Sequence, residues 1–293
     1  MIDVPEALAA SLAKYGGEAG RVFVAALPAL AERFLDQWDL RPDGPARHGW
    51  AALVLPVVRR GDGVPAALKL QALDAETEGE PVALRRWDGD GAVRLIGHDP
   101  GTGTMLLERL DAERTLDHLP DSREAALVIA RLLARLTAAP APPGLRGLGD
   151  IAHDMLEQVP RALAAVPDPA SRRLVARCAA AVREVVDEPG DRLLHWDLHY
   201  GNVLGSERVP WLAIDPKPLA GDPGFDLLPA LDNRYDPAET QWRFDALTDV
   251  LGLDRARAHA WCLGRVLQNL LWNLEDDDPL EREQLEIARD LHP

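Results

Sequence analysis

Residues 192–204, RLLHWDLHYGNVL, form the stretch that decides the fold. A short apolar segment leads into His195, Asp197 and Asn202, and apolar residues then resume, so we expect a loop between two strands. In a loop of the form His-x-Asp-x-x-x-x-Asn, the Asp can orient and deprotonate an acceptor hydroxyl, while the Asn supplies an oxygen ligand to Mg²⁺. The stretch therefore predicts a catalytic loop for phosphoryl transfer, with Asp197 as the base.

A second apolar strand follows at residues 211–215, WLAID, and it ends in Asp215. A carboxylate at that position can bind a Mg²⁺ ion that bridges the β- and γ-phosphates of a nucleotide. Phosphoryl transfer needs little covalent help from a protein but much alignment and charge neutralisation. Asn202 and Asp215 are thus the expected magnesium ligands, and the expected cofactors are ATP and Mg²⁺.

Upstream, Lys69 in the strand-like segment AALKL can pair with the α- and β-phosphates of the nucleotide. An acidic residue in the next segment can hold its ammonium group, and both Glu76 and Glu80 are candidates. Glu80 is preferred because it lies closer to the start of the helical segment VALRRW. A single lysine in a strand often only extends its charged end to the solvent. A lysine, a base and two metal ligands that follow one another in this order are much less often a coincidence.

The residue pattern changes character near residue 110. Residues 50–59 and 64–70 are expected to form a hairpin around a Gly-Asp-Gly turn, and further strands are expected at 93–98 and 104–110. From residue 122 onward the apolar spacing is helical, interrupted by a Pro/Gly-rich loop at 139–149. We expect strands first and helices afterwards, in an α+β fold with a small β-rich lobe, residues 1–110, and a larger helical lobe, residues 111–293.

Composition narrows the class of partner. Lys and Arg number 32 and Asp and Glu number 48, so the net charge is −16, which disfavours nucleic acid and anionic lipid and favours a cationic small molecule. Cys178 and Cys262 are far apart in apolar helical patterns and are expected in the core rather than in a disulfide or metal site. The first residues do not read as a signal peptide, and no segment is long enough to span a bilayer, so a cytoplasmic monomer or homodimer is expected.

No Walker A pattern is present, so the phosphates need another cradle. The loop 43–49 is the candidate, because Gly44 and Gly49 would allow the backbone to approach a phosphate closely.

Taken together, HWDLHYGNVL and WLAIDPKPLAGDPGFDLLPALDNR resemble the catalytic region of the aminoglycoside and hydroxyurea phosphotransferase family, and within it the streptomycin 6-kinase group. The likeness extends to AALKLQ, WDGDGAVRLI, TMLLERL, APPGLRGLG and RVLQNLLWNLED, so it covers most of the chain. It implies the two-lobed protein-kinase-like fold. It also implies a hinge that meets adenine around Glu108 and Leu110, and a structural role for Asp226.

Two departures from wider patterns stand out. Trp196 occupies a position where many relatives in the wider family have glycine, and Asp215-Pro216-Lys217 replaces the Asp-Phe-Gly of protein kinases. Both fit the streptomycin-kinase group, and they count against a protein substrate.

The acceptor implied by the resemblance is streptomycin, whose guanidinium groups carry positive charge. The densest acidity of the chain, Glu275 to Asp278, is one candidate for their recognition, with Trp272 as a stacking face. Asp278 before Pro279 is explained as the N-cap of the last helix, whereas Asp276 and Asp277 oppose the dipole of the preceding helix. A solvated helix end is the equal alternative. His199, two residues after Asp197, could touch the acceptor or simply hold the loop.

Two other functions compete with this one. A kinase of the same fold could act on hydroxyurea, a sugar or an amino alcohol. A nucleotide-binding pseudokinase is disfavoured because the usual mark of such a protein is loss of Lys69, Asp197, Asn202 or Asp215, and all four are present.

Overall fold

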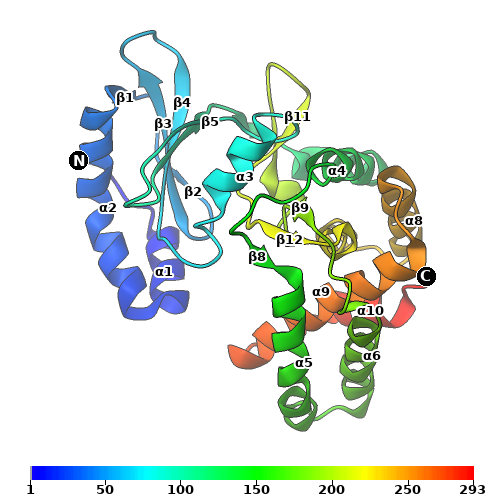
Figure 1. The fold of residues 1–293 in the computed structure, drawn as a ribbon. Helices are drawn as coiled ribbons and strands as arrows, with labels where there is room; N and C mark the ends of the chain where they lie inside the picture. The colour runs from blue at the N-terminus through cyan, green and yellow to red at the C-terminus, as the bar shows by residue number, and fades with distance from the viewer. Residues whose placement is uncertain (1) are drawn as a thin grey trace. The chain divides into compact units, whose positions relative to one another are not determined.

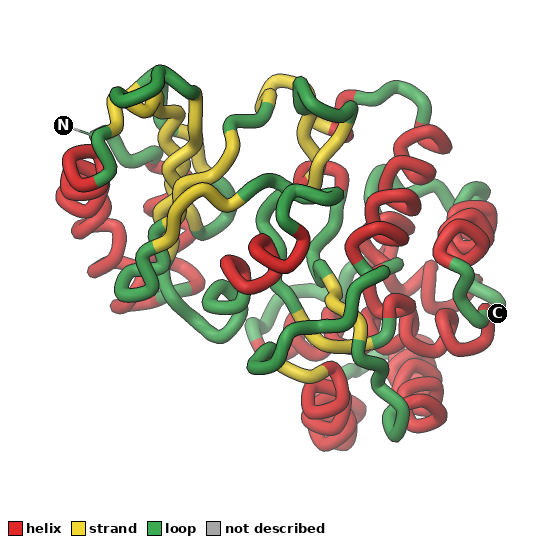
Figure 2. Tube along the Cα trace, turned by 45° about the horizontal axis from the view of Figure 1, so that its top comes forward, coloured by secondary structure: helices red, strands yellow, loops and turns green. Residues whose placement is uncertain are grey.

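The computed structural model describes residues 2–293, and the chain divides into two units, Met1–Asp111 and Ala112–Pro293. Figure 1 follows the chain from end to end, and Figure 2 distinguishes its helices from its strands. The first unit holds the larger sheet, and long helices dominate the second. The predicted α+β class is therefore confirmed.

Two helices open the first unit before any strand, α1 (Glu6–Tyr15) and α2 (Gly17–Gln37). The prediction that strands come first is wrong for this segment. Apolar residues recur along one side of α2, and Leu27, Ala31 and Phe34 are fully buried with Leu8 of α1 in the core of the unit. The two helices cover one face of the sheet (Figure 1).

The sheet of the first unit consists of β1 (Leu40–Pro42), β2 (Arg47–His48), β3 (Ala52–Arg59), β4 (Pro65–Gln71), β5 (Leu95–His98) and β6 (Met105–Glu108). Its order is β1-β3-β4-β6-β5, with β2 paired to β3, and all these pairings are antiparallel. The predicted hairpin is present as β3 and β4, with Gly63 of its turn at φ +72°. The strand expected at 104–110 ends earlier, at Glu108.

Alternation along β4 sends its side chains to two different environments. Ala66, Leu68 and Leu70 join the core beneath α1 and α2. Lys69 and Gln71 therefore point to the opposite face, and both side chains contact the first residue of α3 (Glu80–Trp87). The helix predicted at 82–87 is thus present and begins two residues earlier.

The second unit is built from seven helices among its described residues: α4 (Ser122–Leu136), α5 (Leu148–Ala165), α6 (Pro169–Val185), α7 (Leu228–Asp232), α8 (Thr240–Leu251), α9 (Arg255–Glu275) and α10 (Arg282–Asp290). α9 is buried along most of its length and packs against α5 and α6. Cys178 of α6 and Cys262 of α9 are free, buried thiols, as predicted.

Short strands carry the loops of the second unit. β7 (Asp111–Thr115), β10 (Val203–Gly205) and β11 (Trp211–Ala213) form one three-stranded sheet, and β8 (Arg146–Gly147), β9 (Arg192–Leu194) and β12 (Leu219–Gly221) form another. The loop expected at 139–149 is shorter than predicted, because β8 and the start of α5 occupy its last residues. Loop 43–49 likewise contains β2, which pairs with β3.

Candidate functional site

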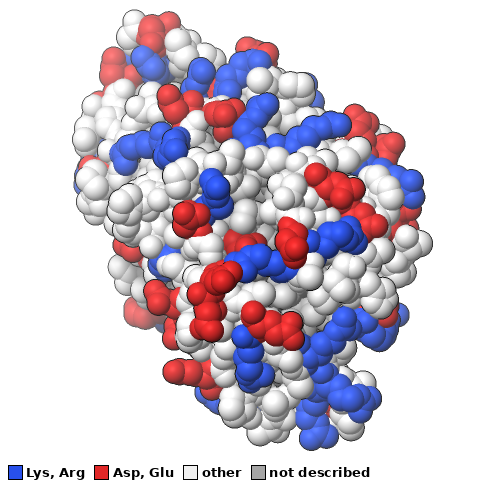
Figure 3. Space-filling model, turned by 45° about the vertical axis from the view of Figure 1, so that its right-hand side comes forward, with Lys and Arg blue, Asp and Glu red and all other residues white. Residues whose placement is uncertain are grey.

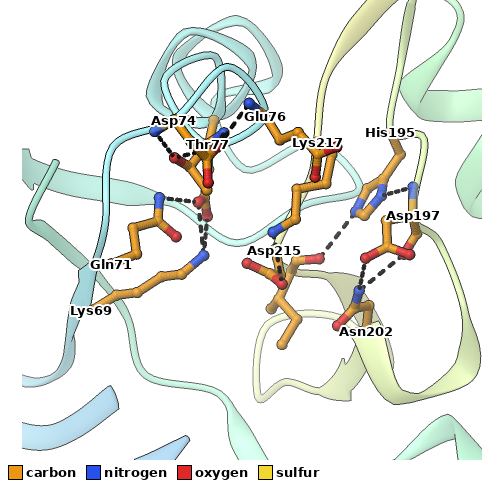
Figure 4. Close-up of polar contacts among 12 residues, drawn as sticks. Lys69, Gln71, Asp74, Glu76, Thr77, His195, Asp197, Asn202, Asp215 and Lys217 are labelled. Atoms are coloured by element: carbon orange, nitrogen blue, oxygen red, sulfur yellow. Dashed lines mark hydrogen bonds and ion pairs between the residues drawn. The ribbon is translucent and has the colours of Figure 1, made fainter. Parts of the chain in front are cut away.

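In the first unit, Lys69 is held by a buried carboxylate. Its Nζ lies 2.8 and 2.7 Å from the two carboxylate oxygens of Glu80, and the side-chain exposure of the pair is 5% and 0%. Gln71 donates a further hydrogen bond to Glu80, at 2.8 Å (Figure 4). Because α3 begins at Glu80, the helix N-terminus also favours this negative charge. Of the two acids considered for Lys69, Glu80 is the one the structure places on its ammonium group.

The expected hinge residues lie at the end of β6. The Glu108 N–H donates to the Arg94 carbonyl at 2.9 Å, and its carboxylate accepts from the Arg94 N–H at 3.1 Å. Leu110 is buried. Between them, Arg109 donates to the carbonyl oxygens of Ala66 and Val57, each at 2.8 Å, which ties this segment to the neighbouring strands. The segment expected to be the hinge is therefore held by hydrogen bonds within its own unit.

The candidate catalytic loop of the second unit runs from the end of β9 to the start of β10, between two strands as predicted. The Asn202 Nδ2 donates to the backbone oxygen of Asp197 at 2.9 Å and lies 3.4 Å from its carboxylate Oδ2 (Figure 4). An amide that donates through nitrogen on one side presents its oxygen on the other. Asn202 therefore fixes Asp197 and can offer Oδ1 to a cation.

Asp215 is brought beside this loop by the hairpin of β10 and β11. Val203 pairs with Ala213, and the Ile214 N–H donates to the Asn202 carbonyl at 2.9 Å. Asp215 follows directly, with a left-handed φ of 57° that an Asp side chain tolerates better than most. Lys217 Nζ lies 3.2 Å from Asp215 Oδ2. The metal-ligand candidates Asn202 and Asp215 are thus adjacent in space, twelve residues of hairpin apart in sequence.

His195 holds the loop in shape as a neutral imidazole. Its Nδ1 accepts from the Asp197 N–H at 3.3 Å, so the proton is assigned to Nε2, which donates to the Ile214 carbonyl at 3.0 Å. The ring is fully buried, and this burial lowers the pKa of His195 from 6.5 to about 3. His195 therefore connects the loop that carries Asp197 to the segment after β11 that carries Asp215.

Asp226 holds the same loop through hydrogen bonds to its backbone. Its two carboxylate oxygens accept the backbone N–H groups of His195 and Trp196, both at 2.8 Å, and the side chain is 1% exposed. Burial raises the pKa of Asp226 to about 6, against the opposing effect of these two donors. The geometry agrees with the structural role that the resemblance implied.

Trp196 adopts a backbone conformation that glycine adopts without strain. Its φ is 66°, in the left-handed region that a bulky side chain adopts at a cost of about 1–2 kcal/mol. The indole is 3% exposed, donates through Nε1 to Gln268 at 3.1 Å, and lies 5.2 Å from the Arg265 guanidinium. Burial and the hydrogen bond offset the backbone strain.

The carboxylate of Asp197 lies in an environment suited to accepting a proton. Burial raises the pKa of Asp197 and the nearby Asp215 carboxylate adds to this rise, while the Arg265 guanidinium opposes it. A buried carboxylate with a raised pKa is a stronger base than one in water. This is the electrostatic property that a general base requires.

The donor chemistry at Asn202 and Asp215 fits Mg²⁺, which is a hard cation that prefers oxygen ligands and keeps several waters. The two side chains supply an amide oxygen and a carboxylate. Among residues 2–293, no group of three or more His, Cys, Asp or Glu side chains is arranged to hold a metal by itself. A magnesium ion held by these two side chains would take its remaining oxygen ligands from water or from a nucleotide.

The first two candidate acceptor residues, His199 and Trp272, both contact other parts of the second unit. The His199 ring accepts from the Gly201 N–H at 3.1 Å, which is a loop contact rather than a free face. Trp272 packs against Trp196 with the two ring planes tilted by 52° and 5.7 Å between centroids, and it also lies 5.3 Å from the Arg265 guanidinium. The protein thus already places one of its own guanidinium groups on the face expected for the acceptor.

The acidic end of α9 is exposed. Glu275 is the last residue of the helix, Asp276 is its C-cap, and Asp277 has a left-handed φ of 55°. Asp278 was predicted as the N-cap of the last helix, and this is wrong, since α10 begins at Arg282 after Glu281. The Asp278 N–H instead donates to the Asn273 carbonyl at 2.8 Å, which closes the turn after α9.

No role was predicted from the sequence for three residues that shape this site: His195, Lys217 and Arg265. The first two stand inside recognisable motifs, so the His-x-Asp and Asp-Pro-Lys patterns were the available signals. Arg265 comes from α9, 68 residues after Asp197; it begins the segment RVLQNLLWNLED that carries part of the resemblance, but that segment does not reveal its contact with Trp196.

The distribution of surface charge does not locate the acceptor site. On the face shown in Figure 3, acidic and basic side chains are interspersed, so the net charge of −16 is not gathered there in one patch. Within residues 2–293, no helix combines the length and the apolar character that crossing a bilayer requires.

Comparison with known proteins gives the family. The chain is 60% identical to a streptomycin 6-kinase of Streptomyces glaucescens over 284 residues, covering 94% of this chain and 92% of that protein. It is also 60% identical to a hydroxyurea phosphotransferase of Kitasatospora aureofaciens, covering 95% and 82% of the two chains. The crystal structure of aminoglycoside phosphotransferase APH(4)-Ia has a TM-score of 0.63 at 16% identity, over 91% of this chain and 100% of that one. The predicted kinase-like fold is confirmed by this likeness. Residues 37–277 match the model of the aminoglycoside/hydroxyurea antibiotic resistance kinases, and the chain belongs to that family.

Proposed function

We propose that this protein is an ATP- and Mg²⁺-dependent phosphotransferase that phosphorylates a hydroxyl of streptomycin, at the 6-position, and so confers resistance to it. The observation that carries the proposal is the loop in which Asn202 holds the partly buried base candidate Asp197. It occurs in a chain 60% identical, over 94% of its length, to a streptomycin 6-kinase.

Four residues of the second unit have roles in the proposed reaction: Asp197, Asn202, His195 and Asp226. Asp197 orients the acceptor hydroxyl and accepts its proton as the new O–P bond forms. Asn202 keeps the Asp197 backbone and side chain in place through its Nδ2. His195 and Asp226 fix the loop from behind, so that Asp197 does not reorganise during the reaction.

Cofactor roles are proposed for residues of each unit separately. Lys69, oriented by Glu80, would hold the α- and β-phosphates, and backbone groups near Glu108 and Leu110 would meet the adenine. Asn202 and Asp215 would hold Mg²⁺, which supplies neutralisation of the phosphate charge when bound. Lys217 pairs with Asp215 in this structure and would balance its charge until the metal arrives.

Streptomycin is preferred as the acceptor because a second relative, from Streptomyces griseus, is also a streptomycin 6-kinase and is 55% identical over 94% of this chain. Hydroxyurea is the second candidate, since the hydroxyurea phosphotransferase is as similar as the first streptomycin kinase. Because ATP is the proposed donor, we place the reaction in the cytoplasm.

An assay of ADP release separates these acceptors. Purified protein with Mg-ATP is offered streptomycin, hydroxyurea or no acceptor, and Asp197→Ala is run beside the wild type. We expect turnover that depends on streptomycin and falls by about 10²-fold or more in the variant. Turnover with hydroxyurea alone would transfer the proposal to that acceptor, and release unaffected by Asp197→Ala would refute the assigned base.

A further inference from the structure

Lys217 contacts a carboxylate that has a second proposed partner. Its Nζ lies 3.2 Å from Asp215 Oδ2, and the side chains of the two residues are 19% and 27% exposed (Figure 4). Across residues 2–293, no other acidic side chain forms an ion pair with this ammonium group. Asp215 is also a proposed Mg²⁺ ligand, so the ammonium group lies on the carboxylate that the cation would bind.

The backbone of Lys217 is fixed, whereas its side chain can move. Pro216 and Pro218 flank the residue, and both are buried. A proline fixes its own φ angle and restricts the residue before it, so the backbone here has few alternative conformations. The Lys217 N–H also donates to the His195 carbonyl at 3.0 Å. The flexible four-carbon side chain is therefore the part of Lys217 that can respond to a ligand.

The ammonium group also lies near the proposed base. Burial raises the pKa of Asp197, and the positive charge of Lys217 is one of the charges that oppose this rise. Lys217 therefore lies close to a proposed base and contacts a proposed metal ligand of the same unit. In phosphoryl transfer the base holds the attacking oxygen and the metal ligand faces the phosphate oxygens. The phosphoryl group would thus pass within reach of the Lys217 side chain.

Electrostatic repulsion gives the ammonium group a reason to move. A Mg²⁺ ion on Asp215 carries two positive charges and repels an ammonium group on the same carboxylate. The oxygens of the phosphoryl group offer the ammonium group a new partner, because the transition state spreads negative charge over three of them. A lysine ammonium group has three N–H donors and no acceptor, so it suits these oxygens.

We propose that Lys217 is a catalytic residue, whose ammonium group leaves Asp215 when the divalent cation binds and donates to the phosphoryl group in transfer. In that step the acceptor oxygen forms a bond to the γ-phosphorus of ATP. The bond from this phosphorus to the β,γ-bridging oxygen breaks, and its electron pair stays on ADP. Asp197 accepts the hydroxyl proton, while Lys217 keeps its protons and contributes positive charge. The catalytic role rests on the proposed function, whereas competition between Lys217 and the cation for Asp215 does not.

The first experiment measures cation binding without nucleotide or acceptor. Mn²⁺ is titrated into the full-length protein, and free Mn²⁺ is followed by electron paramagnetic resonance for the wild type, Lys217→Met and Lys14→Met. Lys14 is an exposed lysine of α1 and serves as the matched control. We expect Lys217→Met to bind Mn²⁺ about threefold more tightly than the wild type, and the control to match the wild type. Unchanged or weaker binding by Lys217→Met would overturn the proposal.

The second experiment follows the ammonium group itself and needs no acceptor. The lysines of the chain are Lys14, Lys69 and Lys217, so protein labelled with ¹³C at the lysine Cε gives a simple NMR spectrum. The Lys217 signal is identified by its loss in Lys217→Met. With Mg²⁺ present, this signal should differ between ADP and the ATP analogue AMP-PNP, because only the analogue carries a γ-phosphoryl group. A Lys217 signal at the same position with both nucleotides would overturn the proposal.

The third experiment measures turnover with Mg-ATP and streptomycin. Lys217→Met should lower kcat by about 10²-fold, while the KM for streptomycin stays within about threefold. Lys217→Arg keeps the positive charge and should restore kcat about tenfold relative to Lys217→Met, which a purely structural role of the side chain does not predict. A wild-type kcat in Lys217→Met would contradict the catalytic role. Absence of streptomycin turnover in the wild type would instead count against the proposed function, and the first two experiments would still decide the proposal.

Discussion

Replacing His195 should change how stability depends on pH, and the size of the change follows from its burial. The pKa of His195 falls from 6.5 in an unfolded chain to about 3 in the folded protein. Below pH ~6.5 the unfolded chain therefore binds one more proton than the folded one at this residue, so stability falls as the pH falls towards about 3. Each pH unit in this window costs about 1.4 kcal/mol. Between pH ~6.5 and pH ~5, His195 should cost the protein about 2 kcal/mol.

The variant His195→Gln keeps a donor for the Ile214 carbonyl but has no group that titrates in this range. At about pH 7.5 it should be less stable than the wild type by about 1–3 kcal/mol, because it packs less well and loses the acceptor for the Asp197 N–H. At about pH 5 that deficit should shrink by about 2 kcal/mol. Asp226 titrates nearby, with a folded pKa of about 6, but it is present in both proteins and cancels from the difference.

Urea unfolding at the two pH values, followed by circular dichroism, measures this difference. His153→Gln, at an exposed position of α5, is the control and should move the difference by less than about 0.5 kcal/mol. A stability difference between wild type and His195→Gln that is the same at both pH values would refute a neutral, buried His195.

Three further substitutions test the framework of the site. Asp226→Asn turns one acceptor of the His195 and Trp196 N–H groups into a donor and should cost about 1–3 kcal/mol of unfolding free energy in a urea titration; an equally stable variant would contradict the anchoring role. Glu80→Gln removes the charged partner of buried Lys69 and should cost about 3–5 kcal/mol, and adding Lys69→Met should restore part of it, so additive losses in the double variant would argue against the pair. Trp196→Gly relieves the left-handed backbone, but the lost indole outweighs that gain, so calorimetry should show a net loss of about 1–4 kcal/mol rather than an increase in Tm.

The parts of the site that lie within short motifs could be predicted from the sequence. In residues 192–204, apolar segments flank the polar residues Asp197 and Asn202, and that pattern implied a loop between two strands, which the structure contains. The preference for Glu80 over Glu76 rested on closeness to a helix, and α3 does begin at Glu80. The local sequence pattern was sufficient to predict a site residue wherever the end of a single strand or helix positions its side chain.

Contacts between distant segments could not be predicted in this way. The chain separates Gln284 from Asp232 by 52 residues, and Trp196 from Gln268 by 72. Helices α1 and α2 were missed because their alanine-rich segments carry no motif, and their burial depends on a sheet formed later in the chain. The cap predicted at Asp278 failed because the Asp-Pro pair closes the turn after α9 rather than starting α10.

The most direct test of the central claim is analysis of the product. Streptomycin is incubated with the protein and Mg-ATP, and the recovered drug is examined by mass spectrometry and ³¹P-coupled NMR. We predict a single added phosphoryl group on the oxygen at the 6-position, formed by the wild type and not by Asp197→Ala. Unmodified streptomycin from the wild type, or the same phosphorylated product from Asp197→Ala, would contradict the account.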